Sequence, residues 1–308
     1  MILYAGLAFI ITLIVTPKIA HFMKRHHITG KDVHKPLQPD VPEMGGLSYI
    51  LSLTIVYGLA FLLLQEPMVV AVLSVGLLSA LIGAFDDLKG LSQKKKLVIT
   101  VFVGIPLFFF VEDTSINFIA FSVDFSWGYY ILVLFGVAAC ANATNILAGF
   151  NGEEAGLGAI GALALGVCCI MLDKRIPLLL LFSLCGALAA FLIFNRYPAH
   201  IFPGDVGTLP IGALISAAVI LGKIEVLGFL ILLPAITEFF LKLRIWFKGK
   251  HYGPTRVIKG RLYPPSYASV ANVVTRRLLL TERTLVIMLW AIEGICGLIA
   301  ISAAFLMI

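Results

Sequence analysis

Charged residues are scarce in this chain: Asp, Glu, Lys and Arg make up 13% of its 308 residues. A soluble domain typically carries about 25% charged and about 45–50% apolar residues. Here 60% of the residues are apolar and the mean hydropathy is +1.02. The lack of charge excludes an ordinary soluble domain, and the high apolar content excludes a disordered chain.

Cysteine is also rare, and no two cysteines form a Cys-x-x-Cys pair. A secreted disulfide scaffold and a cysteine-based metal or redox site are therefore excluded. We interpret the five cysteines as small buried hydrophobes within apolar runs. They are Cys140, Cys168, Cys169, Cys185 and Cys296.

Long apolar runs are what the sequence does contain. A spanning helix takes about 20 residues, so the runs predict an all-α, polytopic membrane protein with ten transmembrane helices in a single domain, residues 1–308. The run at 97–111 is short and contains Pro106, so its ends are poorly defined. The ten runs are 2–22, 45–64, 68–85, 97–111, 128–147, 155–172, 177–194, 206–222, 225–247 and 284–307.

Positive charge follows an alternating pattern along the loops. Of the 23 Lys and Arg residues, only Lys174, Arg175 and Lys223 fall in one set of alternate loops, and the remaining 20 fall in the other set. Because cytosolic loops retain positive charge, we expect the second set to be cytosolic and both termini to be outside. The net charge of +6 then needs no nucleic-acid partner. The first run lacks a charged segment before it and a cleavage site after it, so it does not read as a signal peptide.

Polar residues gather at the cytosolic rim of the predicted bundle. Inside the spans, Glu238 can form an ion pair with Lys242, four residues later. Glu293 lies near the middle of a span, where it is either a hydrogen-bonded contact within the bundle or a functional group. Transporter sites usually lie near the midplane. A polar rim instead favours an enzyme that takes a soluble substrate and a lipid.

Two polar clusters lie in the first half of the chain. Residues 30–36 and 40–46, which include Glu43, form either an anion site or an ordinary positive loop with a turn. Asp86 and Asp87 precede a lysine run that ends at Lys96. Carboxylates beside lysines suit a Mg²⁺–diphosphate site, since Mg²⁺ prefers oxygen ligands; the alternative is a solvated helix end.

Three further groups follow. Asn142 and Asn145 share a helix face and precede a loop rich in glycine and asparagine, which favours a ligand site. Asp205 precedes an apolar run and is either an N-cap or a metal ligand. The segment 248–283 is rich in arginine, which suits phosphate contacts or anionic lipid headgroups.

At these clusters the sequence resembles the polyprenyl-phosphate N-acetylhexosamine-1-phosphate transferases of glycosyltransferase family 4. The resemblance covers the whole chain, with the motifs in the same loops and the same order. The string NATNILAGFNGEEAG (142–156) is similar to the dolichol-type branch. The bacterial branch carries an aspartate-glycine pair twice in this loop, where this chain has Ala148-Gly149 and Asn151-Gly152. The string PGDVGT (203–208) is close to the family's aspartate motif.

The resemblance implies the site residues by position. Asp86 and Asp87 match the aspartate pair, and Lys96 matches the lysine that contacts the diphosphate, so these three are the expected catalytic residues. Asn145 and Asp205 match the ligands of Mg²⁺, with Mn²⁺ as an alternative ion. The match to the family is loose in the last cytosolic loop, which supplies four of the expected substrate-binding residues. The expected substrate-binding residues are Glu43, Asn142, Gly149, Phe150, Asn151, His251, Arg256, Lys259 and Arg261.

The implied reaction is transfer of GlcNAc-1-phosphate from UDP-GlcNAc to dolichyl phosphate, a polyprenyl phosphate, with release of UMP. It is the first step of lipid-linked oligosaccharide assembly for N-glycosylation. We favour direct attack over a covalent aspartyl intermediate, because a phosphate with a second pKa of about 6 is already ionised.

Other functions stay open at this stage. The alternatives are a bacterial-type enzyme that uses undecaprenyl phosphate, a nucleotide-sugar or lipid transporter, and a membrane scaffold. Short loops favour an archaeal plasma membrane over the ER, with the active site facing the cytosol. A homodimer remains open.

Overall fold

The computed structural model describes residues 1–35, 37–246, 255–265 and 269–308. Within these residues, eight helices are long and apolar enough to cross a membrane. The predicted helical bundle is confirmed, and all five cysteines are free thiols. The eight helices are α1 (Ile2–Arg25), α2 (Gly46–Leu64), α3 (Pro67–Lys89), α5 (Gly128–Leu147), α6 (Glu153–Met171), α7 (Arg175–Asn195), α8 (Asp205–Gly222) and α12 (Glu282–Phe305).

The other two apolar runs form interrupted helices. The run at 97–111 is divided between α4 (Gln93–Val101) and a 3₁₀ helix, η1 (Phe102–Phe109). The run at 225–247 is divided between α9 (Glu225–Ile231) and α10 (Leu233–Trp246). A proline lies at each interruption, Pro106 within η1 and Pro234 at the start of α10. Because proline has no N–H to donate, it cannot complete the helical hydrogen bonding there.

In the part of the chain that the structure describes, three antiparallel hairpins and one short helix join the spans, and the sequence patterns predicted none of these hairpins. The hairpins are β1 (Thr29–Lys31) with β2 (Asp40–Pro42), β3 (Ser115–Asn117) with β4 (Ser122–Asp124), and β5 (Arg256–Ile258) with β6 (Arg261–Tyr263). The short helix α11 covers Val270–Arg277. Between β5 and β6, Lys259 and Gly260 have φ of 49° and 75°, which is the backbone of a two-residue hairpin turn.

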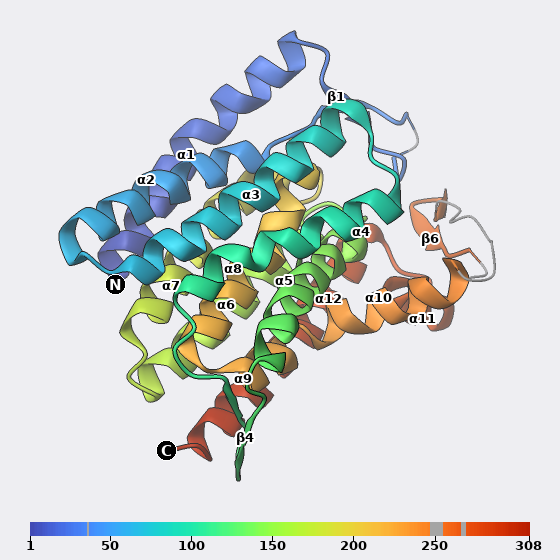
Figure 1. The fold of residues 1–308 in the computed structure, drawn as a ribbon. Coiled ribbons are helices and arrows are strands. Elements are labelled where there is room, and N and C mark those ends of the chain that lie inside the picture. Colours follow the sequence, from blue (N-terminus) through green and yellow to red (C-terminus); the bar gives the residue numbers. More distant parts are fainter. Residues whose placement is uncertain (36, 247–254, 266–268) are drawn as a thin grey trace.

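The hairpins mark the two ends of the bundle. In Figure 1 the labels β1 and β6 lie at one end, and both chain termini lie with β4 toward the opposite end. The end with β1 and β6 is where α3 and α5 finish and where α6, α8 and α12 begin. The predicted polar clusters therefore lie on the same end of the molecule, which we call the rim.

Helix α8 forms the centre of the bundle, since 89% of its spanning window is buried inside the protein. It packs against α3, α5 and α2. Two contacts near its start require glycine. A Cβ on Gly46 of α2 would collide with the backbone of Gly207, and a Cβ on Gly83 of α3 would collide with the backbone of Asp205. The first turn of α8 is thereby held against two neighbouring helices.

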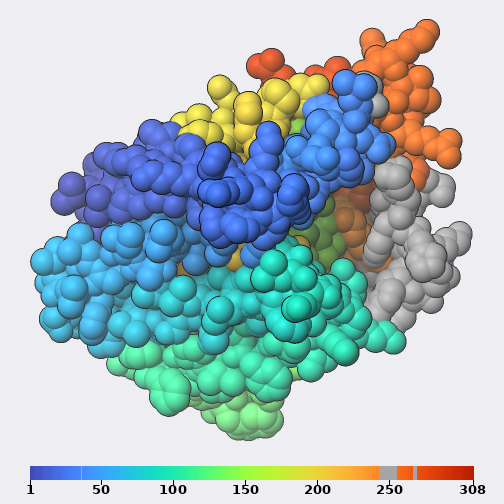
Figure 2. All heavy atoms as spheres, turned by 90° about the horizontal axis from the view of Figure 1, so that it is seen from above, coloured from blue at the N-terminus to red at the C-terminus, as the bar shows by residue number. Residues whose placement is uncertain are grey.

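A second apolar cluster attaches the β5–β6 hairpin to the rim. Leu262 of β6 is buried with Leu147 of α5 and with Leu285 and Leu289 of α12. The N–H of Leu262 also donates to the carbonyl of Leu280 at 2.8 Å. In Figure 2 the blue loop after α1 lies beside the orange segment that contains this hairpin. The rim therefore brings together the early and late parts of the chain.

Candidate active site

Lys96, on the first turn of α4, lies at the centre of the polar rim. Its ammonium group donates a hydrogen bond to Asp205 of α8 and forms an ion pair with Asp86 of α3. Lys96 is buried. Burial alone would lower the pKa of Lys96, but the carboxylates of Asp205 and Asp86 raise it above its usual value. Lys96 is therefore a permanent cation shared by two acidic groups from different helices.

Asp87, the neighbour of Asp86, has a different environment. Its carboxylate accepts the backbone N–H of Asp205 at 2.8 Å and that of Val206 at 3.0 Å. The first N–H groups of a helix have no partner within the helix, so Asp87 caps α8 from outside. The two aspartates thus differ: Asp86 faces Lys96, whereas Asp87 holds the start of α8.

Asn145 completes the cluster from α5. Its side-chain amide donates to Asp205 at 2.8 Å and to the hydroxyl of Thr208 at 2.7 Å. Thr144 donates to the carbonyl of Thr208 at 3.0 Å. These bonds bring Asn145 and Asp205, the two predicted metal ligands, into direct contact.

Asn142 lies one turn deeper and does not join this cluster. It is buried, and its amide donates to Thr100 of α4 at 2.7 Å and to the carbonyl of Ala138 at 2.8 Å. It lines neither of the two rim cavities described below. In the structure Asn142 therefore joins α5 to α4, and the substrate contact expected from the sequence stays a prediction.

A rim cavity of about 240 Å³ opens over the cluster. Asp205 and Thr208 line it from α8, and Glu43 lines it from the loop after β2. Burial, and then the charge of Asp205, raises the pKa of Glu43. Two further predicted residues, Gly149 and Asn151, also line this cavity, so it combines the acidic cluster with the loop between α5 and α6.

That loop is held by carboxylates that bind its backbone. The N–H of Gly149 donates to Glu154 at 3.1 Å, and the N–H of Phe150 donates to Glu153 at 3.1 Å. The N–H of Asn151 donates to Glu282 of α12 at 2.9 Å. Three successive backbone N–H groups are thus satisfied by side chains, which fixes the loop without a regular secondary structure.

A larger cavity, of about 410 Å³, lies on the other side of an aromatic pair. The rings of His34 and Phe150 stack with centroids 4.7 Å apart, and both residues line both cavities. Burial lowers the pKa of His34, although Glu282 and Asp32 act in the opposite direction. Glu238, which forms the predicted ion pair with Lys242 at 2.9 Å, lines the larger cavity.

The described residues of the segment between α10 and α12 that were predicted to bind substrate lie away from the rim cavities. Arg256, Lys259 and Arg261 are exposed on the β5–β6 hairpin, and none of them lines the two rim cavities. Arg261 instead donates to the carbonyl of Leu279 at 3.0 Å. The fourth predicted residue of this loop, His251, lies outside the described residues.

Glu293 of α12 is buried in the spanning part of the bundle, as its mid-span position suggested. It lines a small cavity of about 30 Å³ together with Thr144 and Glu154. That volume is large enough to hold a water molecule. Glu293 thus lies beneath the rim residues and does not line either rim cavity.

An apolar groove of about 510 Å³ runs along the spanning part of α5. On this helix it extends from Cys140 to Tyr129, which is about 16 Å at the helical rise. Ile116 and Phe118 of the β3 segment line its other end. Cys140 lies one helical turn from Thr144, so the groove starts close to the acidic cluster.

Several oxygen ligands are available for a metal ion at the rim. Asp86, Asp205 and Asn145 supply carboxylate and amide oxygens, which are the ligands that Mg²⁺ prefers. Lys96 lies between the two carboxylates and shows that a positive charge is favourable there. The donor set therefore fits Mg²⁺, whereas a zinc site would typically use cysteine or histidine.

Sequence reasoning missed a second acidic group at the rim. Asp32, His34 and Glu282 come from the loop after β1 and the start of α12, and their ligand atoms lie within 4.8 Å of one another. No local spacing joins residues so far apart in the chain. Thr208 was also missed, although it ends the predicted PGDVGT motif.

Comparison with known proteins agrees with this arrangement. The family model described as glycosyl transferase family 4 matches residues 69–223. A protein of Saccharolobus solfataricus with the provisional name UDP-N-acetylglucosamine–dolichyl-phosphate N-acetylglucosaminephosphotransferase is 36% identical in an alignment of 307 positions that covers 96% of this chain and 94% of that protein. A Sulfolobus acidocaldarius protein with the same provisional name is 33% identical in an alignment of 306 positions that covers 95% of this chain and 93% of that protein.

A bacterial relative is more distant. The phospho-N-acetylmuramoyl-pentapeptide-transferase of Streptococcus pneumoniae is 28% identical in an alignment of 226 positions that covers 68% of this chain and 69% of that protein. The family model spans the segment that carries Asp86, Lys96, Asn145 and Asp205. The family resemblance in the motifs is thus confirmed, and with its apolar helices the protein is an integral membrane protein. The chain belongs to glycosyl transferase family 4.

Proposed function

We propose that this protein transfers GlcNAc-1-phosphate from UDP-GlcNAc to dolichyl phosphate or a similar polyprenyl phosphate. The names of its two archaeal relatives support this donor and acceptor. The observation that carries the proposal is the position of Lys96 between Asp86 and Asp205. Asp205 also accepts a hydrogen bond from Asn145 and lines a cavity at the rim. A phosphoryl transfer between two anions needs such a concentration of fixed charge.

In this reaction an oxygen of the lipid phosphate attacks the β-phosphorus of UDP-GlcNAc. The new bond joins that oxygen to phosphorus, and the bond between the β-phosphorus and the oxygen bridging to the α-phosphate breaks. UMP leaves with that oxygen, and the product is a lipid-linked GlcNAc diphosphate. The lipid phosphate is largely ionised at neutral pH, so the main task of the site is to reduce repulsion between the two anions.

Each residue of the cluster has a distinct task under this proposal. Lys96 keeps its charge and contacts a phosphate oxygen. Asp86, Asp205 and Asn145 would hold Mg²⁺, which supplies positive charge to the diphosphate and to the leaving UMP. Asp87 keeps Asp205 at the start of α8. Since Asp87 already accepts two backbone N–H groups, Asp86 is the better candidate for contact with the metal ion.

The two cavities and the groove suggest where each substrate binds. The nucleotide sugar fits the rim cavities, which are lined by Glu43, Phe150 and Asn151. The polyprenyl chain fits the apolar groove along α5, which starts near Thr144 and stays within the spanning part of the protein. This arrangement brings the lipid phosphate to the cluster from the membrane and the nucleotide from the aqueous side.

The orientation in the membrane follows from the charges. The rim carries most of the Lys and Arg residues, so we infer that it faces the cytosol. The archaeal relatives favour the plasma membrane as its location. The bacterial relative makes a cell-wall sugar transferase the second candidate. It is less favoured because this chain has Ala148 and Asn151 where the bacterial branch has aspartates.

The test is to measure the nucleotide released by the purified protein in detergent, with UDP-GlcNAc, dolichyl phosphate and Mg²⁺. We expect UMP, dependent on the lipid and abolished by EDTA. Asp205→Asn should abolish turnover, whereas Asp173→Asn, an exposed aspartate at the opposite end of the bundle, should not. Release of UDP would indicate a glycosyltransferase that breaks a different bond. Release of UMP only with undecaprenyl phosphate and another UDP-sugar would favour the bacterial-type alternative.

A further inference from the structure

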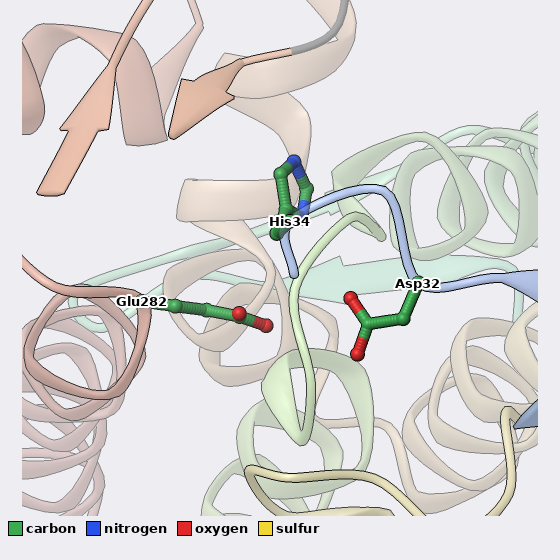
Figure 3. A group of neighbouring side chains, drawn as sticks. All are labelled: Asp32, His34 and Glu282. Carbon is green, nitrogen blue, oxygen red and sulfur yellow. The ribbon is translucent and has the colours of Figure 1, made fainter. Parts of the chain in front are cut away.

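The acidic group formed by Asp32, His34 and Glu282 lies beside the proposed active site but outside the cluster around Lys96. Figure 3 shows the carboxylates of Asp32 and Glu282 pointing toward one another, with His34 next to them. Their ligand atoms lie within 4.8 Å of one another, a spacing that would admit a metal ion. Asp32 and Glu282 are both buried, so their charges need a partner inside the protein.

Lys35 already supplies that partner. Its ammonium nitrogen lies 2.6 Å from Glu282 Oε2 and 3.3 Å from Asp32 Oδ2. It also lies 3.9 Å from the centroid of the Tyr197 ring. The side chain of Lys35 is only 14% exposed. The position between the two carboxylates that a metal ion would take is thus filled by the lysine itself.

The same two carboxylates bind Asn151 in the loop between α5 and α6. Glu282 Oε1 accepts the backbone N–H of Asn151 at 2.9 Å. Asp32 Oδ2 accepts the side-chain amide of Asn151 at 3.0 Å. Asn151 is therefore held at both its backbone and its side chain by acidic groups that Lys35 joins. We call these four residues, Asp32, Lys35, Asn151 and Glu282, the Lys35 network.

The network connects directly to the walls of the rim cavities. Asp32 and Asn151 line the 240 Å³ cavity. Phe150, next to Asn151, and His34, next to Lys35, form the stacked pair that lines both cavities. Lys35 lines neither of the two, so it can act on a bound molecule only through these neighbours.

We propose that Lys35 is a positioning residue: by neutralising Asp32 and Glu282 it holds the loop at Asn151, and with it the Phe150–His34 stack, in the shape that receives the nucleotide sugar. The identity of that ligand rests on the proposed function. The positioning of the loop itself does not, because it follows from the contacts of the Lys35 network.

The first test measures hydrogen exchange at the backbone amides of residues 148–153 in the purified full-length protein. In Lys35→Met the two buried carboxylates repel each other and release Asn151, so exchange should become about tenfold faster, as expected when a hydrogen bond to a charged group is lost. The matched control is Arg175→Met, which removes a basic partner from an exposed ion pair with Asp173 at the opposite end of the bundle. It should leave exchange in this loop unchanged.

A second-site variant separates charge balance from general damage. In Lys35→Met/Glu282→Gln the glutamine carbonyl can still accept the N–H of Asn151, and its amide can donate to Asp32 in place of the lysine. We expect this double variant to recover most of the protection that Lys35→Met loses. The proposed role of the Lys35 network would be wrong if exchange stays unchanged in Lys35→Met. It would also be wrong if the double variant exchanges even faster than Lys35→Met.

The third measurement is steady-state kinetics with UDP-GlcNAc and dolichyl phosphate. We expect Lys35→Met to raise the KM for UDP-GlcNAc about tenfold or more, since a shift of about 1 Å in a binding group can cost up to about a hundredfold. The KM for the lipid and kcat should change much less. Faster exchange with an unchanged KM for UDP-GlcNAc would reduce Lys35 to a purely structural residue. If the unaltered protein has no turnover, the proposed function fails, while the exchange result still decides whether Lys35 orders the loop.

Discussion

The carboxylate of Asp87 accepts the backbone N–H of Asp205 at 2.8 Å, so an aspartate in the last turn of α3 holds the first residue of α8. Asp205 is thereby fixed at its backbone by one aspartate, while its side chain contacts Lys96 and Asn145. Two adjacent carboxylates that look equivalent in the sequence thus perform different tasks. Asp87 holds the backbone of Asp205 in place, and Asp86 shares Lys96 with the side chain of Asp205.

Replacing Asp87 by alanine should destabilise the protein. The change removes the acceptor for two buried N–H groups at the start of α8, and loss of a helix cap costs about 1–2 kcal/mol. Asp87→Asn keeps one carbonyl acceptor and should retain more stability and more turnover. Thermal unfolding in detergent, together with UMP release, measures both effects. If Asp87→Asn is as inactive as Asp205→Asn but melts at the unaltered temperature, Asp87 acts on the substrate and the capping interpretation is wrong.

Lys96→Met should be both unstable and inactive. Without the ammonium group, Asp86 and Asp205 face each other with no cation, and breaking a buried ion pair costs about 3–5 kcal/mol. Turnover should fall by about a hundredfold or more, as it does when a group that stabilises transition-state charge is removed. Lys95→Met, which changes an exposed lysine on the same helix, is the control.

The same variant also tests the metal site. Mg²⁺ should raise the unfolding temperature of Lys96→Met more than that of the unaltered protein, because the ion can replace the missing charge between the two carboxylates. An equal response of both proteins to Mg²⁺ would contradict the assignment of Asp86 and Asp205 as metal ligands.

Asn142→Ala should affect stability and leave substrate affinity unchanged. The side chain joins α5 to α4 through Thr100, and an unsatisfied buried partner costs about 1–3 kcal/mol. We therefore expect a lower unfolding temperature with an unaltered KM for UDP-GlcNAc. Asn145→Ala, one helical turn away, should instead lose turnover. A raised KM in Asn142→Ala at unaltered stability would restore the substrate contact expected from the sequence.

Gly136→Leu should obstruct the acceptor groove. Gly136 lines the groove, and no atom lies within 4 Å of the position that a Cβ would take. The added side chain should raise the KM for dolichyl phosphate and leave the KM for UDP-GlcNAc unchanged. Gly58→Leu, at a helical glycine of α2 with equally open surroundings, is the matched control. An identical response of both variants would place the polyprenyl chain elsewhere.

The sequence predicted most of the bundle because length and apolar content suffice to recognise a spanning helix. Eight of the ten predicted runs are such helices in the described part of the chain. The other two are interrupted, and a proline explains each interruption. Pro106 falls in a short apolar run whose ends were already poorly defined in the sequence. Pro234 falls within a long apolar run, which gave no indication of an interruption. Hairpins of three-residue strands were missed, since such strands are too short to have a recognisable period.

The site could be predicted from the sequence where residues of alternate loops had to come together at one end of the bundle. Lys96, Asn145 and Asp205 are brought together as expected, and Glu43, Gly149, Phe150 and Asn151 line the cavities nearby. The direction of a side chain was not predictable from its position alone. Neighbours on a helix point about 100° apart, which separates Asp86 from Asp87. The exposed basic residues of the β5–β6 hairpin were chosen from a loose match to the family, and a loose match does not determine which way a hairpin faces.

The Lys35 network was invisible in the sequence for another reason. Lys35 and Glu282 lie at nearly opposite ends of the chain and form no motif with a fixed spacing. Only the folded bundle places the loop between β1 and β2 against the start of α12. Long-range ion pairs of this kind carry no local signal, even when they determine the shape of a binding site.

The burial of α8 has a consequence for how the protein is made. Of the eight spanning helices α8 has the lowest mean hydropathy, 1.7, and the highest buried share, so it gains least from contact with lipid. Its main neighbours α2, α3 and α5 are all synthesised before it. During translation α8 therefore packs against helices that are already in the membrane, and the glycines of those helices allow it to approach closely. The polar cluster at the rim can form only then, when Asp205 reaches Asp87 and Lys96.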